Sequence, residues 1–432
     1  MTNTQYYRFK PLNLGRFFIW SLFAIVLIVA PMVFKTSLAL TMLSQMGYLI
    51  IICLSYNILL GQGGMLSFGH AVYVGLGSFI AIHAMNLASK GALPIPLVLI
   101  PVVGGLAGMF FAIILGFVTT KKSGTTFAMI TLGIGELVAS MALMFPGFFG
   151  GEGGITTDRV YGRPFFGLTF GPQIQVYYLI AVYCFICTAL MYAFTGTPLG
   201  RILNAVRDNP ERVEFIGYNT QRVRYFAFII AGFFAGVGGG LAAINFEIVN
   251  AADSLNALRS GSYLLFTFLG GAIFFFGPII GAVLLVFAAV LLSELSKAWQ
   301  LYFGLVFVFM VMFAPGGIAS LVMMNLRVAK FGKFKQFWPL YGGLLVAIIP
   351  VVIGAAALIE MIYHIQLNSA LGPNLPFMGV SLDTSGVASW LGASLILVVG
   401  LIALEFARRR FVRAWGTAQE QIEAEIKRRE LA

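Results

Sequence analysis

Apolar runs of about 17–25 residues alternate with short polar stretches along most of the chain. They predict twelve membrane-spanning helices, because roughly 20 apolar residues in a helix cross a bilayer core about 30 Å thick. The expected spans are about 17–34, 40–60, 65–88, 93–118, 125–145, 174–194, 225–246, 260–276, 278–295, 299–313, 340–359 and 389–406. The eighth and ninth spans meet at Gly277-Pro278, where a re-entrant pair of short helices is the alternative.

The basic residues support this count. If the N-terminus lies in the cytoplasm, twelve spans place most of the 27 lysines and arginines on the inner side, as the positive-inside rule expects. The inner clusters are 8–16, 121–122, 201–224, 327–335 and 408–429. A miscounted span would move the later clusters outside. The prediction is therefore an all-α polytopic membrane protein with both termini cytoplasmic.

Composition agrees with this class. Hydrophobic residues make up 59% of the chain and charged residues 10%, whereas a soluble domain averages about 25% charged residues. A formal charge of +11 would suggest nucleic acid as the partner of a soluble protein. Here the basic residues lie between apolar runs, so membrane lipid is the expected partner and nucleic acid is not. The histidines and cysteines show no metal-ligand spacing, and no metal site is expected.

The sequence gives little support for an ATPase, an enzyme or an ion-driven transporter. It has no G-x-x-x-x-G-K-[ST] stretch, the loop that cradles the phosphates of ATP. No grouping of nucleophile, base and orienting residue indicates an enzyme. Ion-driven transporters usually carry intramembrane carboxylates, and only Glu136 lies well inside a predicted span. Glu136 is equally compatible with contacting a substrate ammonium group and with pairing to a helix polar group.

The longest charged loop between spans is residues 197–224, here called the 197–224 segment. Its sequence predicts two short helices. Thr197 and Asn209 are each followed by proline, the pattern of a cap and a first helical position. Gly217 is suited to ending the second helix. The mixed charges and apolar stripe suit either a docking surface for a cytoplasmic partner or a solvated loop.

The 197–224 segment resembles the cytoplasmic coupling loop of LivM-type branched-chain amino acid permeases of ATP-binding-cassette importers. That pattern is roughly G-R, then A-x-R-D-N, a short acidic helix and I-G-x-N. The matching residues are Gly200, Arg201, Ala205, Arg207, Asp208, Asn209, Ile216, Gly217 and Asn219. At 210–214, where the family usually shows E-x-A-A-E, only Glu214 clearly matches. The resemblance implies that ATPase coupling involves Gly200, Arg201, Ala205, Arg207, Asp208, Asn209, Glu211, Glu214 and Gly217.

Three further stretches are similar to the same family: GQGGMLSFGHAVYVGLGSF at 61–79, SYLLFTFLGGAIFFFGPIIGA at 262–282 and FAPGGIASL at 313–321. The resemblance covers about residues 15–325. It implies that residues 17–325 form a permease core of about ten helices. The apolar runs and basic clusters add a cytoplasmic N-terminus (1–16), a basic linker (326–339), two additional C-terminal transmembrane helices (340–407), which the resemblance does not cover, and a charged cytoplasmic tail (408–432). Within that tail, Thr417 and Glu420 match a capping box and predict the start of a short helix.

The resemblance also implies partners. A LivH-like permease would pair with this chain, and two cytoplasmic ATPase subunits would use ATP and Mg²⁺, so no cofactor is expected on this chain. A periplasmic binding protein would deliver the substrate to a bacterial inner membrane. Permeases for urea or short amides share these motifs and are the nearest alternative. A secondary transporter driven by an ion gradient is the more distant one.

The glycine cluster 61–64 predicts a broken helix that lines a translocation path. Ser67, His70 and Tyr73 follow at a spacing of three and share roughly one helix face. The candidate path residues are Gly63, Gly64, Ser67, His70, Tyr73 and Glu136. Close helix packing is the alternative for this region. It is the preferred interpretation of Gly232, Gly236 and Gly240 in the seventh span.

Overall fold

The structure, a computed structural model, describes residues 14–161, 167, 169–332, 334–367, 372–377 and 379–431. The predicted N-terminal segment 1–16 thus lies largely outside the described residues. The described residues are predominantly helical, and among them eight helices are long and apolar enough to cross a membrane, or up to nine if a bent pair is one span. The chain is a multi-pass, all-α membrane protein, as predicted.

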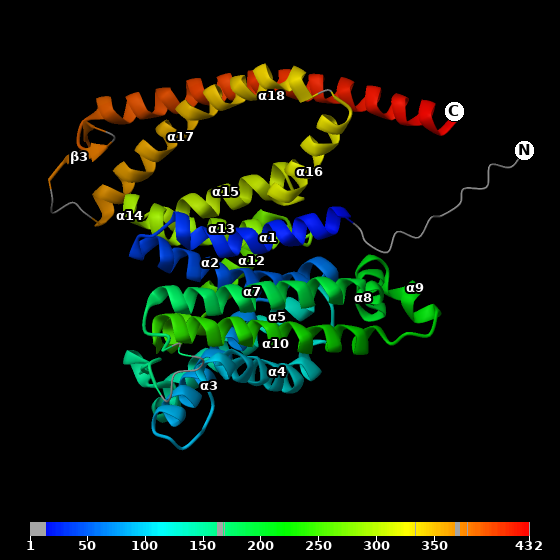
Figure 1. The fold of residues 1–432 in the computed structure, drawn as a ribbon. Helices are drawn as coiled ribbons and strands as arrows, with labels where there is room; N and C mark the ends of the chain where they lie inside the picture. Colours follow the sequence, from blue (N-terminus) through cyan, green and yellow to red (C-terminus); the bar gives the residue numbers. More distant parts are fainter. Residues whose placement is uncertain are drawn as a thin grey trace, which may run out of the picture. The chain divides into compact units, whose positions relative to one another are not determined.

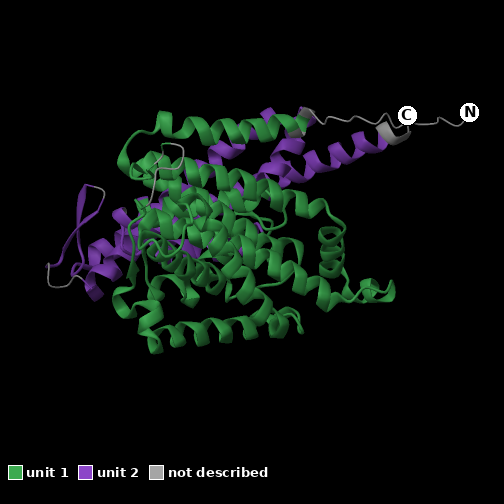
Figure 2. Cartoon of the chain, turned by 60° about the horizontal axis from the view of Figure 1, so that its bottom comes forward, with its two compact units in different colours: residues 1–290, 315–319 green, residues 291–314, 320–432 purple. Residues whose placement is uncertain are grey.

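Contacts divide the chain into two compact units, coloured separately in Figure 2. Unit 1 comprises residues 1–290 and 315–319. Its elements (Figure 1) are α1 (Leu14–Val33), α2 (Ser37–Asn57), α3 (His70–Ser89), α4 (Ile100–Thr119), α5 (Gly124–Met144), α6 (Pro146–Phe149), β1 (Ile155–Thr156), α7 (Gln173–Gly196), α8 (Pro198–Asp208), α9 (Pro210–Phe215), α10 (Thr220–Phe246), β2 (Ile248–Val249), α11 (Ala251–Ser254), α12 (Ala257–Gly270) and α13 (Gly277–Phe287).

Unit 2 comprises residues 291–314 and 320–432. Its elements are α14 (Ser293–Leu295), α15 (Trp299–Phe313), most of α16 (Gly317–Lys330), α17 (Trp338–Leu367), β3 (Asn374–Phe377), β4 (Val380–Asp383) and α18 (Val387–Leu431). Short 3₁₀ or π-helical turns lie at Ile58–Gln62, Leu97–Leu99, Gly151–Gly153, Ala288–Leu292 and Phe334–Phe337. β1 pairs antiparallel with β2, and β3 with β4.

Glycines hold the centre of unit 1 together. α10 packs against α4 and α3 (Figure 1), and the first of these contacts is backbone to backbone. A Cβ atom on Gly236 would lie 2.2 Å from the Gly104 carbonyl oxygen, and one on Gly232 would lie 2.4 Å from Ala112 Cβ. The predicted packing role of Gly232 and Gly236 is therefore confirmed, since any side chain would force the helices apart.

The predicted eighth and ninth spans form a hairpin of short helices. α12 has 14 residues, and neither it nor α13 with its following turn is among the helices long enough to cross a membrane. The two helices pack closely, because a Cβ on Gly281 would lie 2.0 Å from the Phe266 carbonyl oxygen. The chain reverses at Gly271, whose φ is +115°. These lengths favour the re-entrant alternative over two full spans.

The last two predicted spans are longer than their apolar runs. α17 has 30 residues and α18 has 45. The predicted capping box at Thr417 is wrong, because Thr417 lies inside α18 and its hydroxyl donates to the Ala414 carbonyl at 2.9 Å. The charged region continues the helix through local ion pairs, since Glu405 accepts from Arg408 and Arg409, at 2.7 Å each.

The end of α18 also packs against other parts of unit 2. Ala418 and Ile422 are buried with Val328 and Phe337. The described residues of the predicted tail 408–432 therefore belong to a helix that packs against other parts of unit 2. Charged side chains of the same stretch, among them Arg413, Glu420 and Glu423, are exposed.

Candidate functional site

The 197–224 segment forms the two short helices that the sequence predicts. Thr197 caps α8 by accepting a hydrogen bond from the Gly200 amide at 3.2 Å. Asn209 caps α9 by accepting from the Arg212 amide at 3.0 Å. Gly217, with φ of +91°, follows directly after the end of α9. Figure 1 shows α8 and α9 together at the end of α7 and α10.

Each short helix has a buried side and an exposed side. Leu203, Val206 and Val213 are buried, and they pack the helix pair against the rest of unit 1. Phe215 and Ile216 are 89% and 71% exposed, although both are large and apolar. Val213, Phe215 and Ile216 are all apolar residues at or next to the second short helix, but the structure buries Val213 and exposes the other two.

Most of the predicted coupling residues are exposed on the helix pair, whereas Gly200 is buried. The exposed ones on α8 and α9 are Arg201, Ala205, Arg207, Asp208, Glu211 and Glu214. Asp208 is 67% exposed at its side chain and pairs with Arg207 at 2.9 Å. An exposed ion pair of this kind contributes little to folding, so these charges remain available to a partner.

Arg207 connects the helix pair to the glycine break that follows α2. Its Nη1 donates to the Gly61 carbonyl oxygen, and the neighbouring Asn204 Nδ2 donates to Gln62 Oε1 at 2.9 Å. Gly64 has φ of +64°, and a Cβ there would lie 2.8 Å from Arg207 Cγ. Two segments that are more than a hundred residues apart in sequence are thus joined by hydrogen bonds and close packing.

The chain beyond the break enters a buried polar cluster. Tyr56 donates to the Ser67 carbonyl at 2.8 Å, and Ser55 Oγ lies 2.9 Å from His70 Nε2. Ser67 and His70 are fully buried, and Tyr73 is 3% exposed. Among the described residues, Ser67 Oγ and His70 Nδ1 have no hydrogen-bond partner. The structure brings these predicted path residues together in the interior of unit 1, and their pore-lining role stays a prediction.

Two other predicted path residues lie apart from this cluster. Gly63 is in the break, where a Cβ would lie 3.2 Å from Leu203 Cδ1 of α8. Glu136 is on α5 and exposed. No group of three or more His, Cys, Asp or Glu that could hold a metal lies within the described ranges.

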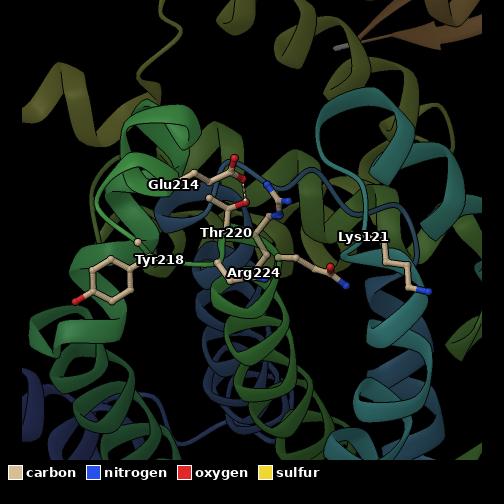
Figure 3. A pocket seen from close by; sticks show the side chains of 8 residues that line it. Lys121, Glu214, Tyr218, Thr220 and Arg224 are labelled. Atoms are coloured by element: carbon tan, nitrogen blue, oxygen red, sulfur yellow. Dashed lines mark hydrogen bonds between the residues drawn. The ribbon is translucent and has the colours of Figure 1, made fainter.

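A polar hollow of about 500 Å³ opens beside α9 and the start of α10 (Figure 3). Its lining consists of Lys121, Glu214, Gly217, Tyr218, Asn219, Thr220, Gln221 and Arg224. Thr220 donates to Glu214 at 2.7 Å, which links α9 to α10. Arg224 is 8% exposed, and its Nε has no hydrogen-bond partner within the described part of the chain. The sequence indicated Arg224 and Lys121 only as basic residues, because their proximity depends on the packing of α4 and α10.

Comparison with known proteins identifies the family of the chain. The family described as branched-chain amino acid transport system / permease component matches residues 38–315. The chain belongs to this family. It is 27% identical to the high-affinity branched-chain amino acid transport system permease protein LivM of Escherichia coli, over 65% of this chain and 69% of that protein.

Two further relatives are permease proteins as well. LivM of Salmonella typhimurium is 26% identical over 66% of this chain and 71% of its own length. A probable branched-chain amino acid transport permease protein LivH of Methanocaldococcus jannaschii is 25% identical over 63% and 84%. No solved structure matches the chain. The family match ends at residue 315, so α17 and α18 lie beyond the part of this permease that the family description covers.

The cap of α9 in this permease can be tested directly. Asn209→Ala removes the acceptor for the Arg212 amide and should lower the stability of α9 by about 1 kcal/mol. Hydrogen exchange should then be about fivefold faster at the α9 amides and unchanged at α10. Asn209→Asp keeps a side-chain acceptor and should exchange like the wild type. Equal exchange in the alanine and aspartate variants would contradict the cap.

Proposed function

We propose that this chain is a translocation subunit of an ATP-binding-cassette importer for branched-chain or related amino acids. It pairs with a second, LivH-like permease, receives substrate from a periplasmic binding protein, and lies in a bacterial inner membrane with both termini in the cytoplasm. Two ATPase subunits bind ATP and Mg²⁺. The chain itself binds neither and catalyses no reaction.

The hydrogen-bonded link between α8 and the break after α2 carries this proposal. Transport by such an importer requires that a conformational change at the cytoplasmic surface is transmitted to the translocation path. Arg207 and Asn204 contact Gly61 and Gln62 directly. The backbone at the break is irregular, and such backbone in membrane proteins is tolerated where it is buried in protein or lines a cavity. A movement of α8 would therefore be transmitted directly to the start of the predicted path.

The exposed ends of the helix pair are the proposed contact for an ATPase subunit. Phe215 and Ile216 are apolar and exposed, which is unfavourable unless a partner covers them. Exposed charged residues, among them Asp208 and Glu211, lie on the same helix pair. An apolar centre with a polar rim is the usual anatomy of a protein interface.

The proposal is tested by reconstituting the chain with its partner subunits in proteoliposomes that contain ATP and Mg²⁺. With the binding protein outside, uptake of radiolabelled leucine should require internal ATP and should continue after an ionophore collapses the membrane potential. Labelled urea serves as the comparison substrate and should enter at the rate of empty vesicles.

Two results would change the assignment. ATP-dependent uptake of urea without uptake of leucine would identify an amide permease of the same fold. Leucine uptake that follows an ion gradient in the absence of ATP would contradict the importer and favour a secondary transporter.

A further inference from the structure

The polar hollow beside α9 and the start of α10 has no part in the proposed function, and its charges do not cancel. Two cations, Lys121 and Arg224, line it together with one carboxylate, that of Glu214. The lining side chains without charge are those of Tyr218, Asn219, Thr220 and Gln221. The hollow therefore has one excess positive charge. Its volume of about 500 Å³ lies within the range of about 300–1,000 Å³ that is usual for small-ligand sites.

Arg224 is a buried cation with an unused hydrogen-bond donor. It is 8% exposed, and its Nε has no hydrogen-bond partner among the residues that the structure describes. One turn further along α10, Phe228 packs on Gly116 of α4, where a Cβ would lie 2.7 Å from Phe228 Cδ1. This contact fixes the height of Arg224 beside the end of α4. An unpaired buried donor costs free energy, so a ligand that accepts from Arg224 would be stabilising.

The carboxylate of the hollow does not fill this role. Glu214 interacts electrostatically with Arg224, but its Oε1 accepts a hydrogen bond from Thr220 at 2.7 Å. In the view of Figure 3, Glu214 and Thr220 lie on one side of Arg224 and Lys121 lies on the other. The space between the two cations is therefore open to an anion.

The start of α10 also favours a negative ligand. α10 has 27 residues, and Asn219 caps it by accepting from the Arg222 amide at 3.0 Å. The N-terminus of a long helix carries a partial positive charge and attracts anions. Arginine and lysine both bind phosphate, arginine through its planar fork and lysine as a point charge. A phosphate group thus fits the donors and the charge of the hollow.

Next to the hollow, the surfaces of α4 and α10 are apolar. Lys121 Nζ lies 4.7 Å above the ring of Phe117, which is one turn back along α4. Phe117 and Phe226 are both exposed. Tyr225 donates to the Ile113 carbonyl at 2.9 Å, and its ring meets the Phe117 ring with centroids 6.3 Å apart. Aromatic side chains near the ends of spans are typical of the membrane interface. A ligand here meets cations at its head and apolar side chains beside them.

We propose that the hollow binds the phosphate group of an anionic phospholipid, with Arg224 and Lys121 as its contacts and with the acyl chains along Phe117 and Phe226. The single negative charge of a phosphodiester matches the excess positive charge of the lining. Basic pockets between transmembrane helices on the cytoplasmic side are suited to lipid headgroups. A carboxylate of a soluble ATPase subunit would match the cations but would leave the apolar side chains unexplained, so the lipid is favoured.

This assignment uses the membrane orientation given under the proposed function, but it does not depend on the transported substrate. The test is photocrosslinking of the purified full-length chain in phosphatidylcholine nanodiscs that contain a small fraction of phosphatidylglycerol with a photoreactive acyl chain. Labelled peptides are identified by mass spectrometry. Crosslinks should map to the end of α4 and the start of α10, and unlabelled phosphatidylglycerol should displace them.

Inorganic phosphate separates a lipid headgroup from a free anion. An excess of inorganic phosphate should leave the crosslinks at α4 and α10 unchanged, because it lacks the acyl chains that lie along the apolar side chains. Displacement by inorganic phosphate to the same extent as by phosphatidylglycerol would identify a site for free phosphate and overturn the lipid assignment.

Neutralising both cations should remove the lipid. The double variant Lys121→Gln with Arg224→Gln should lower crosslinking at α4 and α10 at least about tenfold, because two charge-assisted contacts are lost. Lys122→Gln with Arg222→Gln is the matched control, since these exposed neighbours remove the same charge and do not line the hollow. It should crosslink like the wild type. Labelling of the basic stretch 408–429 is the internal reference in each sample.

Glu214→Gln should increase lipid binding, a result that loss of fold does not imitate. Glutamine keeps a carbonyl acceptor for Thr220 and removes the negative charge that opposes the phosphate. Crosslinking should rise at least about twofold. Thermal unfolding without phosphatidylglycerol shows which variants fold. If Arg224→Gln does not, Lys121→Gln alone is the test, because Lys121 is exposed, and its crosslinking should fall about fivefold.

Unchanged crosslinking at α4 and α10 in a folded double variant overturns the lipid site. If that variant also loses the ATPase subunit on co-purification, an acidic side chain of the partner occupies the hollow instead. Uptake by the reconstituted complex separates these failures from failure of the proposed function. Wild-type vesicles that accumulate leucine with ATP keep the importer even if the lipid site fails. Vesicles that accumulate no amino acid with ATP contradict the importer, whereas the crosslinking result stands by itself.

Discussion

Replacement of Arg207 by alanine should lower ATP-dependent leucine uptake at least about tenfold, while the amount of inserted protein stays unchanged. The substitution removes the donor to the Gly61 carbonyl oxygen and the methylene groups that pack on Gly64. Coupling free energies between sites are typically about 1–3 kcal/mol, or about 5–150-fold. If α8 transmits movement to the break through Arg207, loss of this link uncouples ATP hydrolysis from transport.

The readout is the number of leucine molecules moved per ATP hydrolysed. Arg222→Ala is the control, since Arg222 is an exposed arginine at the start of α10 and does not belong to the predicted coupling set. It should keep the wild-type ratio. Gly64→Ala should resemble Arg207→Ala, because it forces a side chain into the left-handed region at φ of +64° and against Arg207. An unchanged transport-to-hydrolysis ratio in Arg207→Ala would show that the link does not couple the two events.

Replacement of Gly236 by valine should prevent unit 1 from folding. The new Cβ would begin 2.2 Å from the Gly104 carbonyl oxygen and 3.0 Å from Gly108 Cα. Both neighbours are backbone, so relief requires that α10 and α4 separate along their shared contact. Overpacking in a tight core costs about 1–3 kcal/mol, occasionally more, and backbone neighbours place this case at the upper end. The yield of monodisperse protein in detergent should fall at least about tenfold.

Gly133→Val is the control for this substitution. Gly133 lies in α5, another long apolar helix, and a Cβ there meets no atom of the described residues within 4 Å. The control should give wild-type yield and melting temperature. Equal yields from Gly236→Val and Gly133→Val would mean that the α4–α10 contact does not hold the unit together.

Local chemistry explains why the sequence predicted α8 and α9 well. Thr197 and Asn209 each accept a hydrogen bond from an amide three residues later, and Gly217 takes a positive φ. These interactions form within a few residues, so the order of residues is sufficient to predict them. The same holds for the break at 61–64, where glycine permits the conformation of Gly64.

Helix lengths were predicted less well where hydropathy was the only guide. Apolar runs at 260–276 and 278–295 suggested two spans, but the chain turns at Gly271 and forms short helices. The charges after residue 406 suggested a tail, but α18 continues to Leu431. Hydropathy reports the solvent that a segment prefers, and it does not report where the backbone reverses or how far a helix continues.

The sequence by itself determined the multi-pass class, the family and the two capped helices of the 197–224 segment, because apolar content, motif and cap chemistry are local properties. Tertiary structure alone decided that Arg207 reaches Gly61 and that Arg224 and Lys121 line the same hollow. The two partners in each of these contacts lie far apart in sequence. Their meeting depends on close packing of α10 against α3 and α4 at glycines, which no local pattern encodes.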